Sequence, residues 1–291
     1  MTGAGALAVT EAKQPPRPPL APQEEGTAAA DGERPPPSIY SFGYNSHGQL
    51  GLNDQLERSA PRPVRALPSN HIRAIIAACG SSHSLIVDQH GGVFSWGSNA
   101  HGQLGTGDVT ERSEPTKISC DGQRINGIAC GSAHTLLCTS RGRVLACGSN
   151  ADGQLGLATG TDTSSTSIRS STAHVLMHTS VAHLHGTRIV GVACGFSHSL
   201  FLSRPGGVLS CGANASGQCG HGITTDCYSP PSTIEALMAT ACSAIACGNF
   251  HSVTLTREDG GVYTWGEGRF GRLGHGAASS EFLPRLVGAL S

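Results

Sequence analysis

Short apolar runs separated by Gly-rich turns recur along the chain from residue 38 onward. Val93 to Trp96 and Thr135 to Thr139 are two such runs, each bounded by turn residues. Runs of this length predict short β-strands rather than long helices. Leu85 to Val87 is apolar at consecutive positions, which predicts a strand buried on both faces between neighbouring sheets.

Glycine and proline mark the ends and edges of these strands. Paired or single glycines at Gly91-Gly92, Gly142, Gly206-Gly207 and Gly260-Gly261 predict tight antiparallel hairpins, because glycine adopts φ > 0 without strain. A proline follows the last glycine of four longer turns by ten residues, and a missing N–H is tolerated best in an edge strand. These prolines are Pro61, Pro115, Pro230 and Pro284.

Two sequence phrases alternate along the chain in a fixed order. The first is an aromatic residue or Cys, then Gly, then a turn closed by Gly-Gln-Leu-Gly or a near copy, and it occurs five times. The second is Ala-Cys-Gly-x-x-His, which occurs four times. The glycine of the first phrase recurs every 51 to 64 residues, a period typical of a propeller blade. We expect structural roles for the repeated residues Gly43, Gly97, Gly148, Gly212, Gly266, Gly80, Gly131, Gly195, Gly248, His83, His134, His198 and His251.

From Ser38 to the C-terminus the chain resembles the repeats of the regulator of chromosome condensation family. Trp96 to Gly105 and Cys130 to His134 match both family phrases in order and spacing. The resemblance implies an all-β fold, a β-propeller of RCC-type repeats over residues 38–291. Four units are complete, at about 38–87, 91–138, 142–202 and 206–255, and a partial unit covers 260–291.

The family's full propeller has seven blades, so the resemblance implies an incomplete ring. Either residues 6–10 supply a missing strand, or the chain is a fragment of a longer one, and we favour the second explanation. Residues 1–37 are rich in Pro, Ala and Glu and predict a disordered tail. Its Pro runs could also dock to a groove that reads extended chains. The third unit carries a Ser/Thr/His-rich insertion at 159–185, which does not resemble the loop by which the family's founding member acts on a small GTPase.

Composition restricts the class of partner and the compartment. A net charge of -1 gives no electrostatic case for nucleic acid or an acidic membrane. Most of the 11 cysteines fall inside the repeat, and equivalent cysteines are expected to point apart and to stay reduced. The N-terminus has no basic start or long apolar run, so we expect no signal peptide or membrane span and a cytoplasmic or nuclear protein.

Three patterns suggest ligand chemistry, and each has a structural alternative that we prefer. Gly266 to Gly271 reads Gly-x-Gly-x-x-Gly, but it occupies a repeat turn with no helix after it. Pairs such as Cys79 and His83 resemble zinc ligands, but the repeat distributes them around a ring, so each His is expected to hydrogen-bond within its own blade. His174 and His178 would share one face of a helix, and with His183 and His185 we interpret them as a polar surface loop rather than a metal site.

No catalytic order of residues emerges beyond the repeat, so we expect no enzyme activity, no cofactor and no metal. The leading hypothesis is a protein-interaction scaffold that presents loops on a rigid propeller. The alternative, implied by the resemblance, is guanine-nucleotide exchange on a Ran-like or other small GTPase. The family's plant ultraviolet photoreceptor depends on a dense Trp cluster, whereas this chain has two Trp. The candidate partner-binding residues are Arg58, Arg62, Glu111, Arg112, Glu114, Asp226, Tyr228, Glu281 and Arg285.

Overall fold

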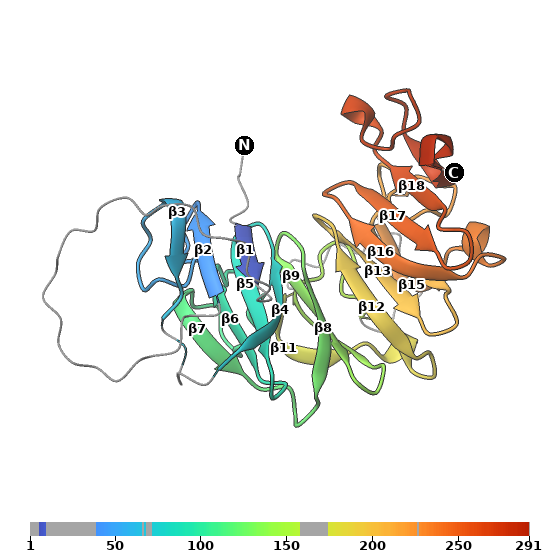
Figure 1. Cartoon of the computed structure of the whole chain (residues 1–291). Coiled ribbons are helices and arrows are strands. Elements are labelled where there is room, and N and C mark those ends of the chain that lie inside the picture. The colour runs from blue at the N-terminus through green and yellow to red at the C-terminus, as the bar shows by residue number, and fades with distance from the viewer. Residues whose placement is uncertain are drawn as a thin grey trace, which may run out of the picture.

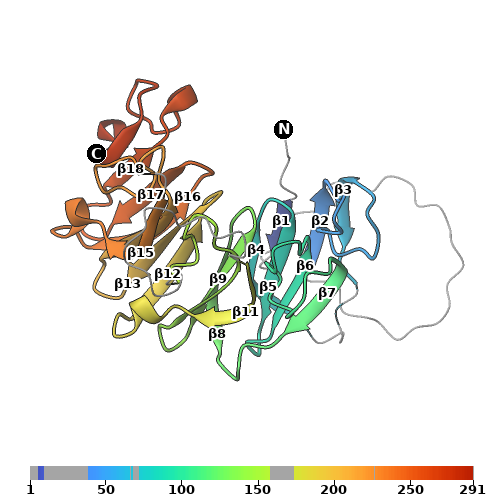
Figure 2. The same cartoon turned by 180° about the vertical axis from the view of Figure 1, so that it is seen from behind.

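A computed structural model describes residues 6–9, 39–65, 67, 72–157, 174–225 and 227–290. Within these residues, five antiparallel sheets follow one another along an open arc (Figure 1). The arc runs from β1–β3 at one end to β16–β19 at the other, and the view from behind shows the same order (Figure 2). The predicted all-β architecture of propeller blades is confirmed.

Each complete blade has four strands, ordered in the sheet as they are in the chain. The blades are β4 (Ala74–Cys79), β5 (His83–Asp88), β6 (Val93–Gly97) and β7 (Arg112–Ile118); β8 (Ile125–Cys130), β9 (His134–Thr139), β10 (Val144–Ser149) and β11 (His174–Ser180); β12 (Ile189–Cys194), β13 (His198–Ser203), β14 (Val208–Ala213) and β15 (Cys227–Thr233); and β16 (Cys242–Cys247), β17 (His251–Thr256), β18 (Val262–Gly266) and β19 (Glu281–Leu286). The first sheet is β1 (Ala6–Val9), β2 (Ile39–Gly43) and β3 (Arg58–Pro63). Three-residue 3₁₀ turns lie at η1 (Ala182–Leu184), η2 (Glu235–Leu237), η3 (Arg269–Gly271) and η4 (Gly288–Leu290).

The sheets begin in the middle of the sequence units. The unit 38–87 supplies β2 and β3 to the first sheet and β4 and β5 to the next. The three-stranded sheet therefore lies at the N-terminal end of the arc, and β16–β19 form a full blade. β1 pairs with β2, with Ala6 opposite Phe42. Residues 6–9 of the predicted tail thus form a strand, as expected from the alternative in which residues 6–10 supply a missing strand. The rest of 1–37 lies outside the described residues.

The outer strand of a blade is the predicted edge strand. Pro61, Pro115, Pro230 and Pro284 lie in β3, β7, β15 and β19 respectively. β11 takes the same place without a proline, so residues 174–180 of the predicted insertion belong to the blade itself. Residues 158–173 of that insertion lie outside the described part of the chain.

The hydrophobic cores lie between neighbouring sheets. One core joins Ile39 and Val64 of the first sheet to Phe94 and Trp96 of the next, and three further clusters fill the interfaces that follow. β5, β9 and β13 are buried at every position, as predicted for Leu85 to Val87. In the last blade, by contrast, the equivalent strand β17 has partly exposed positions, and Leu255 on it is 38% exposed. No sheet within the described residues covers the far side of this blade.

Candidate protein-interaction surface

The propeller has two unlike faces, which differ in the loops they carry. The turn face carries the long connections between the third and fourth strands of each sheet, which contain the Gly-Gln-Leu-Gly phrase. The hairpin face carries the short turns between the second and third strands, such as Asp88 to Val93, and the connections between blades. Of the predicted partner-binding residues, Glu111 lies in a turn-face loop, and Arg58, Arg112 and Glu281 begin the strands that follow such loops.

A buried asparagine organises each of four turns. Oδ1 of Asn99 accepts a hydrogen bond from the backbone N–H of Leu104 at 3.0 Å. Its Nδ2 donates to the carbonyls of Asp108 and Thr110 at 2.9 and 3.0 Å. The sequence reasoning missed this residue, although the signal was present, because an Asn stands two positions after the first glycine in four of the five turns. Its equivalents are Asn45, Asn150 and Asn214, all buried.

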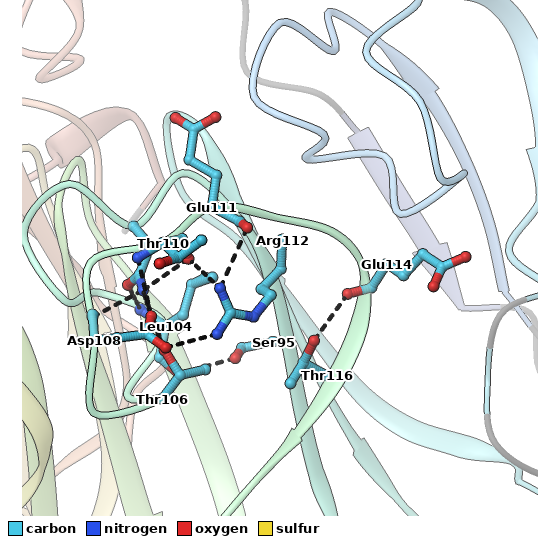
Figure 3. A network of polar contacts seen from close by, with 10 residues as sticks. Ser95, Leu104, Thr106, Asp108, Thr110, Glu111, Arg112, Glu114 and Thr116 are labelled. Carbon is cyan, nitrogen blue, oxygen red and sulfur yellow. Dashed lines mark hydrogen bonds and ion pairs between the residues drawn. The ribbon is translucent and has the colours of Figure 1, made fainter.

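Arg112 lies in the same network and turns back onto its own loop (Figure 3). Its Nη2 lies 2.7 Å from Oδ2 of Asp108, and its Nη1 donates to the carbonyl of Thr110 at 2.7 Å. The backbone N–H of Thr110 and the guanidinium of Arg112 hold the pKa of Asp108 below its usual value. Arg58 repeats the arrangement with Asp54 in the first sheet. Both arginines therefore fix the loop, and their charges are already paired.

The other predicted contact residues have different environments. Glu111 Oε1 lies 2.6 Å from Nδ1 of His47, so this pair links the second blade to the turn of the first sheet. Glu281 and Arg285 pair with each other on β19 at 2.5 Å. Glu114 is exposed on β7. Asp226 lies outside the described residues, and Tyr228 is described only as backbone paired with Gly212.

Arg62 lies beside a groove along the edge strand β3. The groove has a volume of about 700 Å³ and is lined by Leu52, Arg58, Arg62, Pro63 and Arg65. Arg62 and Arg65 are exposed and form no ion pair with any residue in the described part of the chain. Arg65 was not among the partner-binding residues predicted from the sequence. Its charge, two positions beyond Pro63, could have indicated an exposed residue after the edge strand. The groove combines an apolar floor of Leu52 and Pro63 with a cationic rim in which Arg62 and Arg65 form no ion pair within the described residues.

Three of the four repeated histidines, His83, His134 and His198, reach the next blade, so for them the prediction of a bond within their own blade is wrong. Nε2 of His83 lies 3.0 Å from Oγ1 of Thr135, and that hydroxyl donates to the carbonyl of Gln103 at 2.7 Å. Because the hydroxyl has one proton and gives it to Gln103, it accepts from the Nε2–H of His83. His134 with Ser199 and His198 with Ser252 repeat the contact at 3.1 and 3.0 Å.

The side chain before each turn glycine completes this inter-blade joint. The carbonyl of Gln49 accepts from Ser84 Oγ at 2.8 Å and from the indole N–H of Trp96 at 2.9 Å. Trp265 and Ser252 donate in the same way to the carbonyl of Gln218. Cys147 and Cys211 occupy the Trp position at the two other joints, with their Sγ atoms 3.4 and 3.6 Å from the carbonyls of Gln103 and Gln154.

Burial keeps the joint histidines neutral. Nδ1 of His134 is buried and has no hydrogen-bond partner, so a second ring proton would find no acceptor. Burial lowers the pKa of His134 and His198 to about 3 and that of His83 to about 4. The glycine of the Ala-Cys-Gly phrase is required beside the ring, because a Cβ on Gly131 would lie 2.0 Å from Cε1 of His134.

The equivalent cysteines share one space, so the prediction that they point apart is wrong. Cys79, Cys130, Cys194 and Cys247 all line a cavity of about 200 Å³ between the ends of the inner strands. None of these four cysteines forms a disulfide. Burial raises the pKa of Cys130 and Cys194 well above the usual value, which keeps these groups as thiols.

His174 and His178 lie on a strand rather than on a helix, whereas His183 lies in the 3₁₀ turn η1. His174 begins β11 at the surface, where its ring centroid lies 4.6 Å from that of His101. His178 on the same strand is half-buried, with its Nδ1 buried and without a hydrogen-bond partner. Loss of solvent around the ring lowers its pKa to about 4, and its Nε2 lies 3.9 Å from Cys147 Sγ. Within the described residues, no group of three or more His, Cys, Asp or Glu side chains is arranged to hold a metal ion.

The four-stranded blades and the hydrogen bonds that join them define a propeller protein built from repeats. Comparison with known proteins identifies its family. Residues 37–291 match the family described as the RCC1-like domain, and the chain belongs to that family. The ultraviolet-B receptor UVR8 of Arabidopsis thaliana is 36% identical over 250 residues, which cover 86% of this chain and 53% of UVR8. Human HERC6, a probable E3 ubiquitin-protein ligase, is 34% identical over 86% of this chain and 23% of its own length.

Solved structures show the same fold. Human WBSCR16 superposes with a TM-score of 0.72 at 25% identity, covering 88% of this chain and 63% of that one. Prp20p of Saccharomyces cerevisiae, described with its binding to Gsp1p and histones, superposes with a TM-score of 0.70 at 22% identity, covering 86% and 58%. The chain thus spans about half the length of UVR8 and less than two thirds of both solved structures. No helix in its described part is long and apolar enough to cross a membrane.

Proposed function

We propose that this chain is a non-enzymatic protein-interaction module. We propose further that it binds a partner protein at the arginine-lined groove on β3. The observation that carries the proposal is the contrast among the arginines of the loops. Arg58 and Arg112 form ion pairs within their own loops. Arg62 and Arg65, by contrast, are exposed beside the apolar floor of the groove. An apolar floor with a cationic rim suits a short protein segment that carries both apolar and acidic side chains.

The position of the groove favours binding of an extended segment. β3 is an edge strand that pairs with β2 on one side, so its other edge is free of strands in the described residues. Such an edge offers backbone groups to a bound chain, although Pro61 and Pro63 remove two of its donors. Affinity in the groove would therefore come mainly from side chains. Charge reversal of the rim is the direct perturbation.

Affinity capture from a cell extract tests the proposal. The bait proteins are the wild type, R62E/R65E, and R269E as a control on the turn face of the last blade, where Arg269 is 77% exposed. We expect the wild type and R269E to recover the same partners and R62E/R65E to lose at least one of them. Identical recovery by all three baits would refute the groove as the contact surface. A second pair of baits, E114R and wild type, tests the exposed side of strand β7 in the same way.

Guanine-nucleotide exchange is the alternative function. It is favoured by the shared fold with Prp20p, which is described with its binding to Gsp1p. An exchange factor binds the nucleotide-free GTPase more tightly than the nucleotide-bound form. Release of labelled GDP from a Ran-like GTPase and a panel of other small GTPases separates the two functions. Acceleration above the spontaneous rate would support exchange, and its absence across the panel would eliminate it.

A further inference from the structure

The hairpin face carries arginines at equivalent places in consecutive blades. Arg73, Arg124 and Arg188 each stand immediately before an inner strand, at the starts of β4, β8 and β12. All three are exposed. The backbone carbonyl of each accepts a hydrogen bond from the hairpin of its own blade, for example from the N–H of Ser140 to Arg124 at 2.8 Å. The repeat therefore places an exposed arginine at the same backbone position of each of these three blades.

Hairpin arginines extend this row across the interfaces between blades. Arg141 and Arg143 flank Gly142 at the β9–β10 hairpin. Arg188 of the next blade packs its stem against that glycine, since a Cβ on Gly142 would lie 2.5 Å from Cγ of Arg188. The N–H of Arg204 then donates to the carbonyl of Arg188 at 2.8 Å.

The row continues into the last blade. Nη2 of Arg257 lies 3.4 Å from the carbonyl of Arg204. At the other end, Arg124 and Arg141 line one pocket of about 190 Å³ together with Asp121. We name the continuous set Arg124, Arg141, Arg143, Arg188, Arg204 and Arg257 the arginine arc.

The arginine arc has no acidic partners of its own. None of its six guanidinium groups forms an ion pair within the described residues, in contrast to Arg58, Arg112 and Arg285 on the turn-face loops. Nearby carboxylates are engaged elsewhere. Asp88 accepts from the N–H groups of His90 and Gly92, and Asp259 accepts from Thr256 and Gly261. Asp121 and Glu258 remain as exposed acids at the two ends of the arc.

Six neighbouring like charges, none of them in an ion pair within the described residues, favour an anionic partner. The guanidinium group binds carboxylate or phosphate through two parallel hydrogen bonds. The three hairpins that carry Arg141, Arg204 and Arg257 contain no Phe, Tyr or Trp, so they offer no aromatic platform on which nucleic-acid bases could stack. A carboxylate-bearing protein segment needs no such platform.

We propose that the arginine arc is a docking surface for an acidic protein segment, a run of Asp and Glu that crosses three blades of the hairpin face. The surface lies apart from the groove on β3 and has its own variants, so the two proposals can fail independently. The near-neutral net charge of the chain conceals this surface, because acids elsewhere balance it. Binding should weaken as salt rises, since the contacts are solvent-exposed charges.

Fluorescence anisotropy with a labelled peptide of about twelve alternating Asp and Glu residues tests the proposal, at salt concentrations of about 0.05 M and 0.2 M. The test variant is R141E/R188E/R204E. The control, R62E/R65E/R269E, changes the net charge equally away from the arc. We expect the test variant to lose affinity by about tenfold or more and the control by less than about twofold. R141K/R188K/R204K keeps the charge and should give an intermediate loss, because lysine lacks the paired donors.

Three results would overturn the proposal. The first is no binding of the peptide by the wild type at the lower salt concentration. The second is an equal loss in the test variant and its control, which would indicate general electrostatic attraction. The third is tighter, arc-dependent binding of a single-stranded oligonucleotide of the same charge, which would assign the arc to nucleic acid. Fluorescence of the buried Trp96 and Trp265 reports whether each variant is folded.

Discussion

Mild acid should destabilise this propeller through its buried histidines. Burial lowers the pKa of His83 and His178 to about 4 and that of His134 and His198 to about 3. In the unfolded chain these rings titrate near pH 6.5, so below that pH the unfolded state binds protons that the folded state does not. Their contribution is therefore fully present above pH 6.5 and is lost as the pH falls toward 4.

The size of the effect follows from proton linkage. Each ring that remains neutral in the folded state adds at most about 1.4 kcal/mol per pH unit to the slope of unfolding free energy against pH. Between pH 6.5 and about 5.5 the unfolded ring goes from half to mostly protonated, which costs about 1 kcal/mol per histidine. Four such rings therefore cost about 4 kcal/mol over one pH unit, a large part of the stability of a typical domain.

Urea unfolding at a series of pH values, followed by Trp fluorescence, measures this slope. Trp96 and Trp265 are both fully buried and report on two different blades. H134Q keeps an N–H donor for the inter-blade bond but removes the titrating ring, and it should lower the slope by about a quarter. H90Q, at an exposed position of a hairpin, is the control and should leave the slope unchanged. A wild-type slope in H134Q, or equal reductions in both variants, would refute the reasoning.

Three further substitutions probe the joints and turns. T135V removes the hydroxyl that accepts from His83 and should cost about 1–3 kcal/mol of unfolding free energy in urea, whereas T135S should cost less than half as much. G131A places a methyl group 2.0 Å from Cε1 of His134 and should lower the thermal midpoint by several degrees or more, and an unchanged midpoint would contradict the close approach. N99A removes the bonds that close its loop and should speed limited proteolysis between residues 106 and 112 relative to wild type, with unchanged cleavage counting against its role.

The strands and their burial were predictable from the sequence because their signals are local. Leu85 to Val87 is apolar at every position, and a strand between two sheets requires that pattern. The hydrogen-bond partner of His83 was not predictable from the sequence. Each repeat of about fifty residues offers an equivalent hydroxyl, and sequence spacing does not show whether the histidine bonds to the one in its own blade or to the one in the next. The role of Arg112 was missed because the Asp four residues earlier pairs with it in a turn rather than on a helix.

The offset between sequence units and sheets has a consequence for how such chains change in evolution. Gln103 and Thr135, which bond across a blade interface, both belong to the unit 91–138, and Gln49 with Ser84 shows the same relation in the unit 38–87. One repeat of the sequence thus encodes the central bond of an interface rather than a blade. A duplication or loss of one repeat in the gene would therefore copy or delete this bond whole. The His83–Thr135 and Trp96–Gln49 contacts join two successive units, and they would re-form between whichever repeats become neighbours.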